Sequence, residues 1–144
     1  MLATDIIQKA IVMSSEGNVL LLRRSKTDVR RPLQWDFPGG MLDEGEPLEQ
    51  GVAREIREES GICVDSVRLF FSKTELGKWI DSQGEHKRNV VRQYFSAKTD
   101  SETVVLSDEH DDYCWVSLDK ALELLEYDRH RQVISHIIDN QLEL

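Results

Sequence analysis

The clearest pattern of apolar positions lies between Pro47 and Gly61, where Leu48, Val52 and Ile56 recur every four residues. This spacing places the three side chains on one face of an α-helix. Proline suits the first turn of a helix, where its missing N–H is not needed. Glycine suits the position just past the end. We therefore predict a helix that packs its apolar stripe against a sheet.

Runs of β-branched and other apolar residues predict the strands. Ile6–Met13 and Val19–Arg24 flank a turn that contains Gly17, which is consistent with a hairpin. A polar loop follows at Ser25–Gln34, and a polar connection around Gly77–His86 separates two later strands. These later strands and a short further one are Val64–Thr74, Asn89–Ala97 and Asp112–Val116.

Two more helices are predicted at Leu118–Tyr127 and His130–Leu142, where apolar residues have helical spacing. Helices before, between and after strands indicate an α/β fold with a mixed sheet and helices on both faces. The chain has 144 residues and shows no repeat, low-complexity segment or linker. We expect a single domain, residues 1–144.

Composition narrows the class of protein. Hydrophobic residues make up 40% and charged residues 31%, which is ordinary for a soluble globular protein. The net charge of −9 argues against a surface that binds nucleic acid polymers. Met1 to Ala10 lack the pattern of a signal peptide, and no stretch is apolar enough to span a membrane. Cys63 and Cys114 are expected to be reduced thiols in or near the core, and the location to be cytoplasmic.

Three carboxylates on the predicted helix suggest chemistry. Glu55, Glu58 and Glu59 stand at i, i+3 and i+4, offsets that share one helix face. They repel one another unless a divalent cation lies between them, and Mg²⁺ prefers carboxylate oxygens and substrate phosphates as ligands. The alternative is a solvated acidic face offset by Arg54 and Arg57.

A glycine-rich turn precedes this helix. It contains Gly39 and Gly40, and glycine allows the backbone to approach a ligand closely. A backbone carbonyl in this turn is a candidate to join the carboxylates as a metal ligand.

The segment from Gly40 to Ile62 resembles the signature of Nudix hydrolases, Gly-x5-Glu-x7-Arg-Glu-aliphatic-x-Glu-Glu-x-Gly-aliphatic. The chain fills every position, with Gly40, Glu46, Arg54, Glu55, Ile56, Glu58, Glu59, Gly61 and Ile62. The full spacing with the attached glycine turn favours a functional site over a solvated face. The resemblance implies the Nudix α/β/α sandwich with a central mixed sheet.

The resemblance also implies roles for these residues. Glu58 and Glu59 would bind Mg²⁺, with Mn²⁺ as a substitute, and the Gly39 carbonyl would be a further ligand. Glu55 would be either a metal ligand or the general base. Arg54 would orient the acidic side chains with Glu46 as its partner, and an i,i+4 pair between Arg54 and Glu58 is an equal alternative.

Related proteins often add a fourth carboxylate from a loop beyond the signature. Glu109, six residues before Trp115, is the candidate, although Asp108, Asp111 and Asp112 compete for this assignment. The neighbouring His110 is expected to be a surface residue rather than a ligand.

Candidate substrate residues are Arg23 and Arg24 at the end of a strand, because guanidinium groups suit phosphate oxygens. Trp35 and Trp79 are candidates to stack on a nucleobase, with core packing as the alternative for Trp35. Rival basic residues are Arg30, Arg31, Arg88 and Arg92.

Taken with the resemblance, these features predict Mg²⁺-dependent hydrolysis of a pyrophosphate bond in a small nucleotide. The run Trp35-Asp36-Phe37-Pro38-Gly39-Gly40 resembles MutT-type members and favours a (deoxy)nucleoside triphosphate, cleaved to monophosphate and pyrophosphate. Alternatives are ADP-ribose, a dinucleoside polyphosphate or a nucleotide sugar. A nucleotide-sensing domain without activity is disfavoured, because none of the glutamates is missing. The sequence leaves a monomer and a homodimer equally open.

Overall fold

The computed structural model describes residues 2–144. Met1, the first residue of the predicted domain, lies outside the described residues. The strands are β1 (Thr4–Ser14), β2 (Val19–Arg24), β3 (Trp35–Asp36), β4 (Gly39–Met41), β5 (Val67–Asp81), β6 (Gly84–Thr99) and β7 (His110–Val116). The helices are α1 (Leu48–Ser60), α2 (Leu118–Leu124) and α3 (Asp128–Asp139).

The sheet is mixed and opens between its first two strands. β1 runs parallel to β6 along its whole length, but it pairs with β2 only at Met13 and Val19. Away from this pair of residues, β4 pairs with β1 and β3 pairs with β2. The two short strands β3 and β4 therefore lie in the gap between β1 and β2. The predicted hairpin of β1 and β2 is therefore limited to the turn and one paired position, Met13 with Val19.

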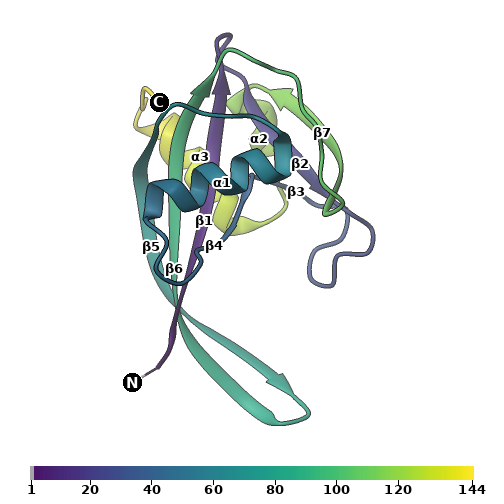
Figure 1. The fold of residues 1–144 in the computed structure, drawn as a ribbon, viewed down its shortest axis with the longest axis vertical. Helices are drawn as coiled ribbons and strands as arrows, with labels where there is room; N and C mark the ends of the chain where they lie inside the picture. Colours follow the sequence, from purple (N-terminus) through teal and green to yellow (C-terminus); the bar gives the residue numbers. More distant parts are fainter. Residues whose placement is uncertain (1) are drawn as a thin grey trace.

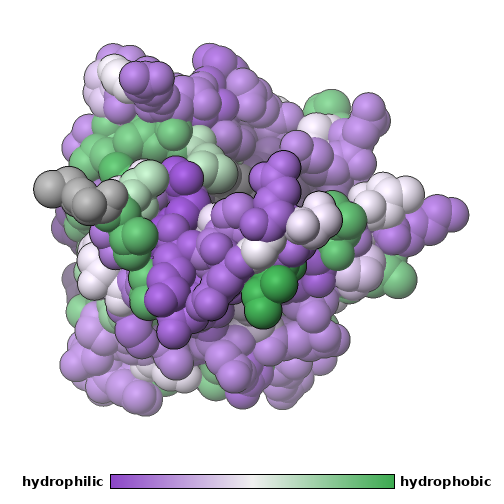
Figure 2. Space-filling view, turned by 90° about the horizontal axis from the view of Figure 1, so that it is seen from below, coloured by the Kyte–Doolittle hydropathy of each residue, from purple (hydrophilic) through white to green (hydrophobic). Residues whose placement is uncertain are grey.

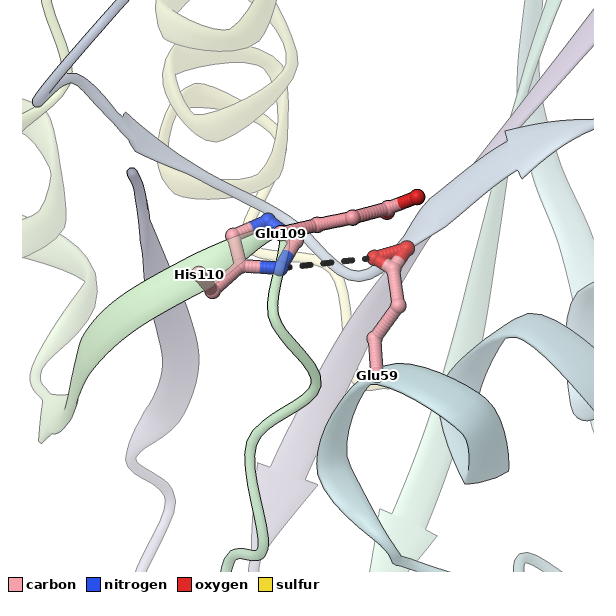
Figure 3. A group of neighbouring side chains, drawn as sticks. All are labelled: Glu59, Glu109 and His110. Carbon is pink, nitrogen blue, oxygen red and sulfur yellow. Dashed lines mark ion pairs between the residues drawn. The ribbon is translucent and has the colours of Figure 1, made fainter. Parts of the chain in front are cut away.

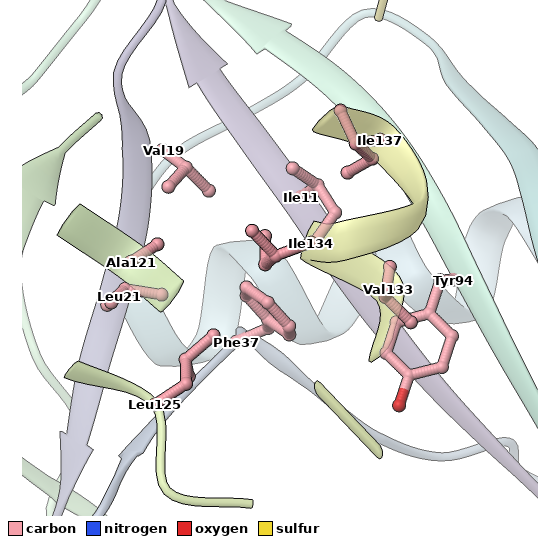
Figure 4. Packing of buried hydrophobic residues seen from close by; sticks show 10 residues of the cluster. All are labelled: Ile11, Val19, Leu21, Phe37, Tyr94, Ala121, Leu125, Val133, Ile134 and Ile137. Carbon is pink, nitrogen blue, oxygen red and sulfur yellow. The ribbon is translucent and has the colours of Figure 1, made fainter. Parts of the chain in front are cut away.

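Helices cover both faces of the sheet, with α1 on one side and α2 and α3 on the other (Figure 1). Val52 and Ile56 of α1 are fully buried in one core, together with residues of β1, β2 and β6. A second core joins α2 and α3 to the opposite face, around Phe37, Ile11 and Ile134 (Figure 4). This arrangement confirms the predicted α/β/α sandwich.

The ends of α1 follow from its sequence. Pro47 precedes the first helical residue in an extended conformation, with ψ of 144°. Gly61 ends the helix in the left-handed region, with φ of 76°, and its N–H donates to the Arg57 carbonyl. A residue with a Cβ is strained in this conformation. The helix therefore stops directly after Glu58 and Glu59, and its last turn lies beside β4.

The prediction of an irregular polar connection around Gly77–His86 is wrong, because these residues belong to two paired strands. β5 and β6 continue as an antiparallel hairpin as far as Asp81 and Gly84, and this arm projects beyond the sheet (Figure 1). The side chains of the arm are mostly exposed on both faces, so its sequence lacks the alternation of buried and exposed residues that marks a strand. Seen from below, the surface is mainly hydrophilic, with apolar groups interrupted by polar ones (Figure 2).

Other predictions need smaller corrections. Cys63 is exposed, so its predicted place near the core is wrong, whereas Cys114 is half-buried; both thiols are free. The predicted helix to Tyr127 ends at Leu124, and the one predicted from His130 begins at Asp128. In residues 2–144, no helix has the length and apolar character needed to cross a membrane.

Candidate active site

The three glutamates of α1 point to different surroundings. The Glu59 residue is 3% exposed, and its Oε1 accepts a hydrogen bond from the Gly39 N–H at 3.1 Å. The Glu55 side chain is 15% exposed and lies against Gly40, whereas that of Glu58 is 53% exposed. The prediction of a shared face therefore holds for the backbone positions, but the carboxylates spread from a buried to an open environment.

The glycine turn fits closely between β1 and α1. A Cβ at Gly39 would lie 2.0 Å from the Gln8 carbonyl oxygen, and the φ of Gly39 is 152°. A Cβ at Gly40 would lie 2.7 Å from Oε1 of Glu55. Gly39 thus requires glycine because its neighbours are backbone atoms, whereas a side chain at Gly40 would displace the carboxylate of Glu55.

Arg54 connects the carboxylates at the outer side of the helix. Its Nε and Nη2 donate to Oε2 and Oε1 of Glu46, at 2.8 and 3.0 Å. Its Nη1 donates to Glu55 and to Glu58, both at 3.1 Å. Both sequence-based alternatives for Arg54 are therefore realised. The hydrogen bonds with Glu46 are the main reason why the pKa of Arg54 is raised.

Burial changes the protonation of the inner carboxylates. It raises the pKa of Glu59 to about 8, against the opposing effects of Lys9 and the Gly39 N–H. Burial also raises the pKa of Glu55, and Arg54 opposes that shift. Oε2 of Glu59 is buried and has no hydrogen-bond partner among the described residues. A buried carboxylate oxygen of this kind fits a divalent cation, which would compensate its charge.

Glu109 and His110 approach Glu59 from the start of β7 (Figure 3). One ligand atom from each of these residues lies within 4.8 Å of the others. The prediction that His110 is a surface residue is wrong, because it is 8% exposed and its Nδ1 lies 3.8 Å from Oε2 of Glu59. Burial lowers the pKa of His110 to about 4.

Glu59, Glu109 and His110 line a cleft of about 700 Å³, whereas Glu55 and Glu58 are not among its lining residues. This size is within the range of small-molecule sites. The lining of the same cleft also includes basic residues and one aromatic ring. They are Lys9 of β1, Arg24 of β2, Arg30 and Arg31 of the following loop, Arg92 of β6, and Tyr127 between α2 and α3. The cleft thus brings an acidic wall and a basic wall together.

Comparison with known proteins identifies this architecture. Residues 7–137 match the model of the NUDIX domain. "Nucleoside triphosphatase NudI" of Klebsiella pneumoniae is 30% identical over 128 residues, which cover 84% of this chain and 88% of that protein. "Putative nudix hydrolase 1" of Caenorhabditis elegans is 32% identical over 78 residues, which cover 52% of this chain and 21% of that protein.

The chain belongs to the Nudix family. Among solved structures, the MutT protein from Methanosarcina mazei Go1 is similar, with a TM-score of 0.75 and 28% identity. That match covers 99% of this chain and 98% of the other. The chain is accordingly a Nudix hydrolase.

The basic wall of this Nudix domain is organised by one buried carboxylate, Asp36, which is fully buried. Its Oδ2 lies 3.1 Å from Nζ of Lys9, 2.7 Å from Nη1 of Arg24 and 3.7 Å from Nη2 of Arg31. Its Oδ1 lies 2.6 Å from Nε2 of the buried His130. Burial raises the pKa of Asp36, but Lys9, His130 and Arg31 outweigh it, so the pKa lies well below its ordinary value.

Of the four predicted substrate residues, Arg24 lines the cleft of the Nudix domain. Arg23 pairs with Asp111 at 2.8 Å and lies over the ring of Trp35, which packs against the second core. Trp79 stacks on His86 in the β5–β6 arm. The structure places Arg23, Trp35 and Trp79 outside the residues that line the cleft.

Sequence reasoning did not identify Lys9, Asp36 or Tyr127 as site residues. Tyr127 lies beneath three guanidinium groups, with Cζ of Arg31 3.8 Å from the ring centroid. These residues come from distant parts of the chain, and no local spacing marks them. The acidic Asp36 beside a proline-glycine turn was the one available signal, since a buried carboxylate requires basic partners.

Proposed function

We propose that this Nudix hydrolase cleaves a (deoxy)nucleoside triphosphate to the monophosphate and pyrophosphate, with Mg²⁺ as cofactor and Mn²⁺ as a substitute. The observation that carries the proposal is the pairing of two walls in one cleft. On one wall Glu59 presents a buried oxygen that has no hydrogen-bond partner within residues 2–144, and the other wall presents Arg24, Arg31 and Lys9.

The residues that would hold the cation are Glu55, Glu58, Glu59, Glu109 and the carbonyl of Gly39. A bound divalent cation supplies charge neutralisation at the phosphates and activates water. The acidic wall of this cleft would repel a polyphosphate in the absence of such a cation. The unpartnered Oε2 of Glu59 is the structural reason to expect one.

In this proposal Glu55 either accepts a proton or binds the cation. Its side chain is mostly buried, and burial raises its pKa above the ordinary value of a glutamate, which makes the carboxylate a stronger base. Arg54 holds the carboxylate through Oε1, and Glu46 holds Arg54 by two hydrogen bonds. Arg54 and Glu46 are thus positioning residues in this proposal.

The basic wall would hold the phosphates. Arg24 and Arg31 are anchored near Asp36, and guanidinium groups bind phosphate oxygens by paired hydrogen bonds. The name of the NudI relative supports a nucleoside triphosphate as substrate. A cytoplasmic location is part of the proposal and agrees with two free cysteines. Either a monomer or a homodimer is compatible with it.

A substrate screen with chromatographic separation of products tests the proposal. It should include (deoxy)nucleoside triphosphates, ADP-ribose, dinucleoside polyphosphates and nucleotide sugars, each with Mg²⁺. We expect triphosphates to give monophosphate and pyrophosphate, and Glu58→Gln to reduce turnover. The matched control is Glu49→Gln, an exposed glutamate in the first turn of α1. Cleavage restricted to ADP-ribose or nucleotide sugars would reject a triphosphate as the substrate.

A further inference from the structure

Two buried polar atoms face each other at the inner end of the cleft. Oε2 of Glu59 and Nδ1 of His110 are 3.8 Å apart, and within residues 2–144 neither has a hydrogen-bond partner. Both residues are more than nine-tenths buried. An unsatisfied buried polar atom is costly, so two of them directed at one point indicate that a further group binds between them.

The backbone fixes His110 in this position. The residue begins β7 and pairs with Arg24 of β2, at a register shift next to Arg23. The preceding carbonyl, of Glu109, accepts a hydrogen bond from the Ser25 N–H at 3.0 Å. His110 is therefore held on both sides, and Figure 3 shows its ring directed at the carboxylate of Glu59.

Glu59 is fixed in a complementary way. Its Oε1 is occupied by the Gly39 N–H, which leaves Oε2 directed at the histidine. Two ligands about 2.1 Å from a shared ion stand between about 3.0 and about 4.2 Å apart, depending on the angle at the ion. The observed separation of 3.8 Å lies inside this range. Glu109 offers a third atom within 4.8 Å of both.

We propose that Nδ1 of His110 is a metal ligand, so that the cation site of this enzyme has a mixed nitrogen and oxygen donor set. This inference rests on the proposed function, which places a divalent cation beside Glu59. Carboxylate, carbonyl and water ligands suit both Mg²⁺ and Mn²⁺, whereas an imidazole ligand favours first-row transition metals over Mg²⁺. His110 should therefore raise the affinity of the site for Mn²⁺ relative to its affinity for Mg²⁺, the cofactor of the proposed function.

Electron spin echo spectroscopy of the Mn²⁺-loaded protein tests the inference, because it detects nitrogen bonded to the ion. We expect ¹⁴N modulation in the wild type and its loss in His110→Ala and His110→Gln. His86→Ala is the matched control, since His86 stacks on Trp79 in the β5–β6 arm, and it should keep the modulation. Bound Mn²⁺ without ¹⁴N modulation in the wild type would overturn the inference and leave the carboxylate site of the proposed function standing.

Calorimetric titration of the same variants gives a second measurement. We expect His110→Gln to weaken Mn²⁺ binding by at least about tenfold and Mg²⁺ binding by less than about threefold. Equal weakening for both ions would overturn the role of His110 in metal preference. Failure of the wild type to bind either ion would instead reject the metal site itself, and the proposed function with it. The wild-type spectrum needs no variant, so the test remains decisive even if His110→Ala does not fold.

Discussion

The two walls of the cleft are built in different ways. On the acidic wall, the glycine turn and α1 place Glu59 beside Gly39, and the start of β7 adds Glu109 and His110. Glu55 packs against Gly40 outside the cleft lining. The basic wall is assembled from β1, β2, the following loop, β6 and the turn before α3. A helix fixes spacing locally, whereas the basic residues depend on a buried anion to hold them together. We therefore expect the acidic wall to control chemistry and the basic wall to depend on Asp36 for its stability.

The largest effect is expected from Asp36→Asn, which removes the charge common to Lys9, Arg24 and His130. Breaking a buried charge pair by removing one partner costs about 3–5 kcal/mol of unfolding free energy. Urea denaturation measures this loss, with the exposed Asp65→Asn as control. The loss should be complete above the ordinary pKa of aspartate and should shrink as pH falls below it, because the pKa of Asp36 is lowered in the folded state. An equally stable variant would show that the basic wall does not depend on this anion.

On the acidic wall, Glu59→Gln should lower kcat/KM on the order of 100-fold or more, since it removes a charged oxygen from the proposed cation site. The fold should be retained, because glutamine keeps a carbonyl oxygen for the Gly39 N–H. Steady-state kinetics and thermal unfolding measure the two properties, and Glu49→Gln is the control. A stable Glu59→Gln variant with wild-type kinetics would show that Glu59 has no role in catalysis.

Glu59 also predicts a pH dependence of the unfolding free energy, with the opposite sign to that of Asp36. Burial raises the pKa of Glu59 to about 8, above its value of 4.5 in the unfolded chain. The folded protein therefore binds the proton more tightly, and this stabilisation is lost as pH rises from about 4.5 through about 8. Without a divalent cation, stability should fall over this interval more steeply in the wild type than in Glu59→Gln. Saturating Mg²⁺ should remove the difference in slope; an identical slope without the cation would argue against the raised pKa.

A smaller change is expected from Arg31→Lys on the basic wall. The lysine keeps the charge but loses the planar group that lies 3.8 Å from the centroid of the Tyr127 ring. We expect KM for the triphosphate to rise by about tenfold, with kcat nearly unchanged, because a binding contact is lost. Arg68→Lys, at an exposed position of β5 outside the cleft, is the matched control. A fall in kcat without a change in KM would assign Arg31 to the chemical step.

The smallest effect is expected at the β5–β6 arm. Trp79→Ala removes a ring that stacks on His86 and lies outside the cleft lining. Kinetic constants should stay within about twofold of the wild type, the range expected of a residue that contacts no substrate. A large rise in KM would restore the sequence-based assignment of Trp79 to substrate binding.

Local patterns predicted α1 and the position of Glu59 beside Gly39, because both depend on helix spacing and a glycine turn. The same reasoning predicted β1, β2 and the two-sided sandwich, where buried apolar residues mark each element. It missed the β5–β6 arm because neither face of the arm is packed, so pairing alone defines these strands. It missed the burial of His110 and the partners of Asp36 because both depend on residues far apart in the sequence.

The most direct measurement is ³¹P NMR of a nucleoside triphosphate incubated with the enzyme, with and without Mg²⁺. We predict equal amounts of nucleoside monophosphate and pyrophosphate with Mg²⁺, no turnover with chelator, and turnover lowered on the order of 100-fold or more in Glu59→Gln. Turnover that persists in the presence of chelator, or at the wild-type rate in Glu59→Gln, would contradict the assignment of the acidic wall as the cation site.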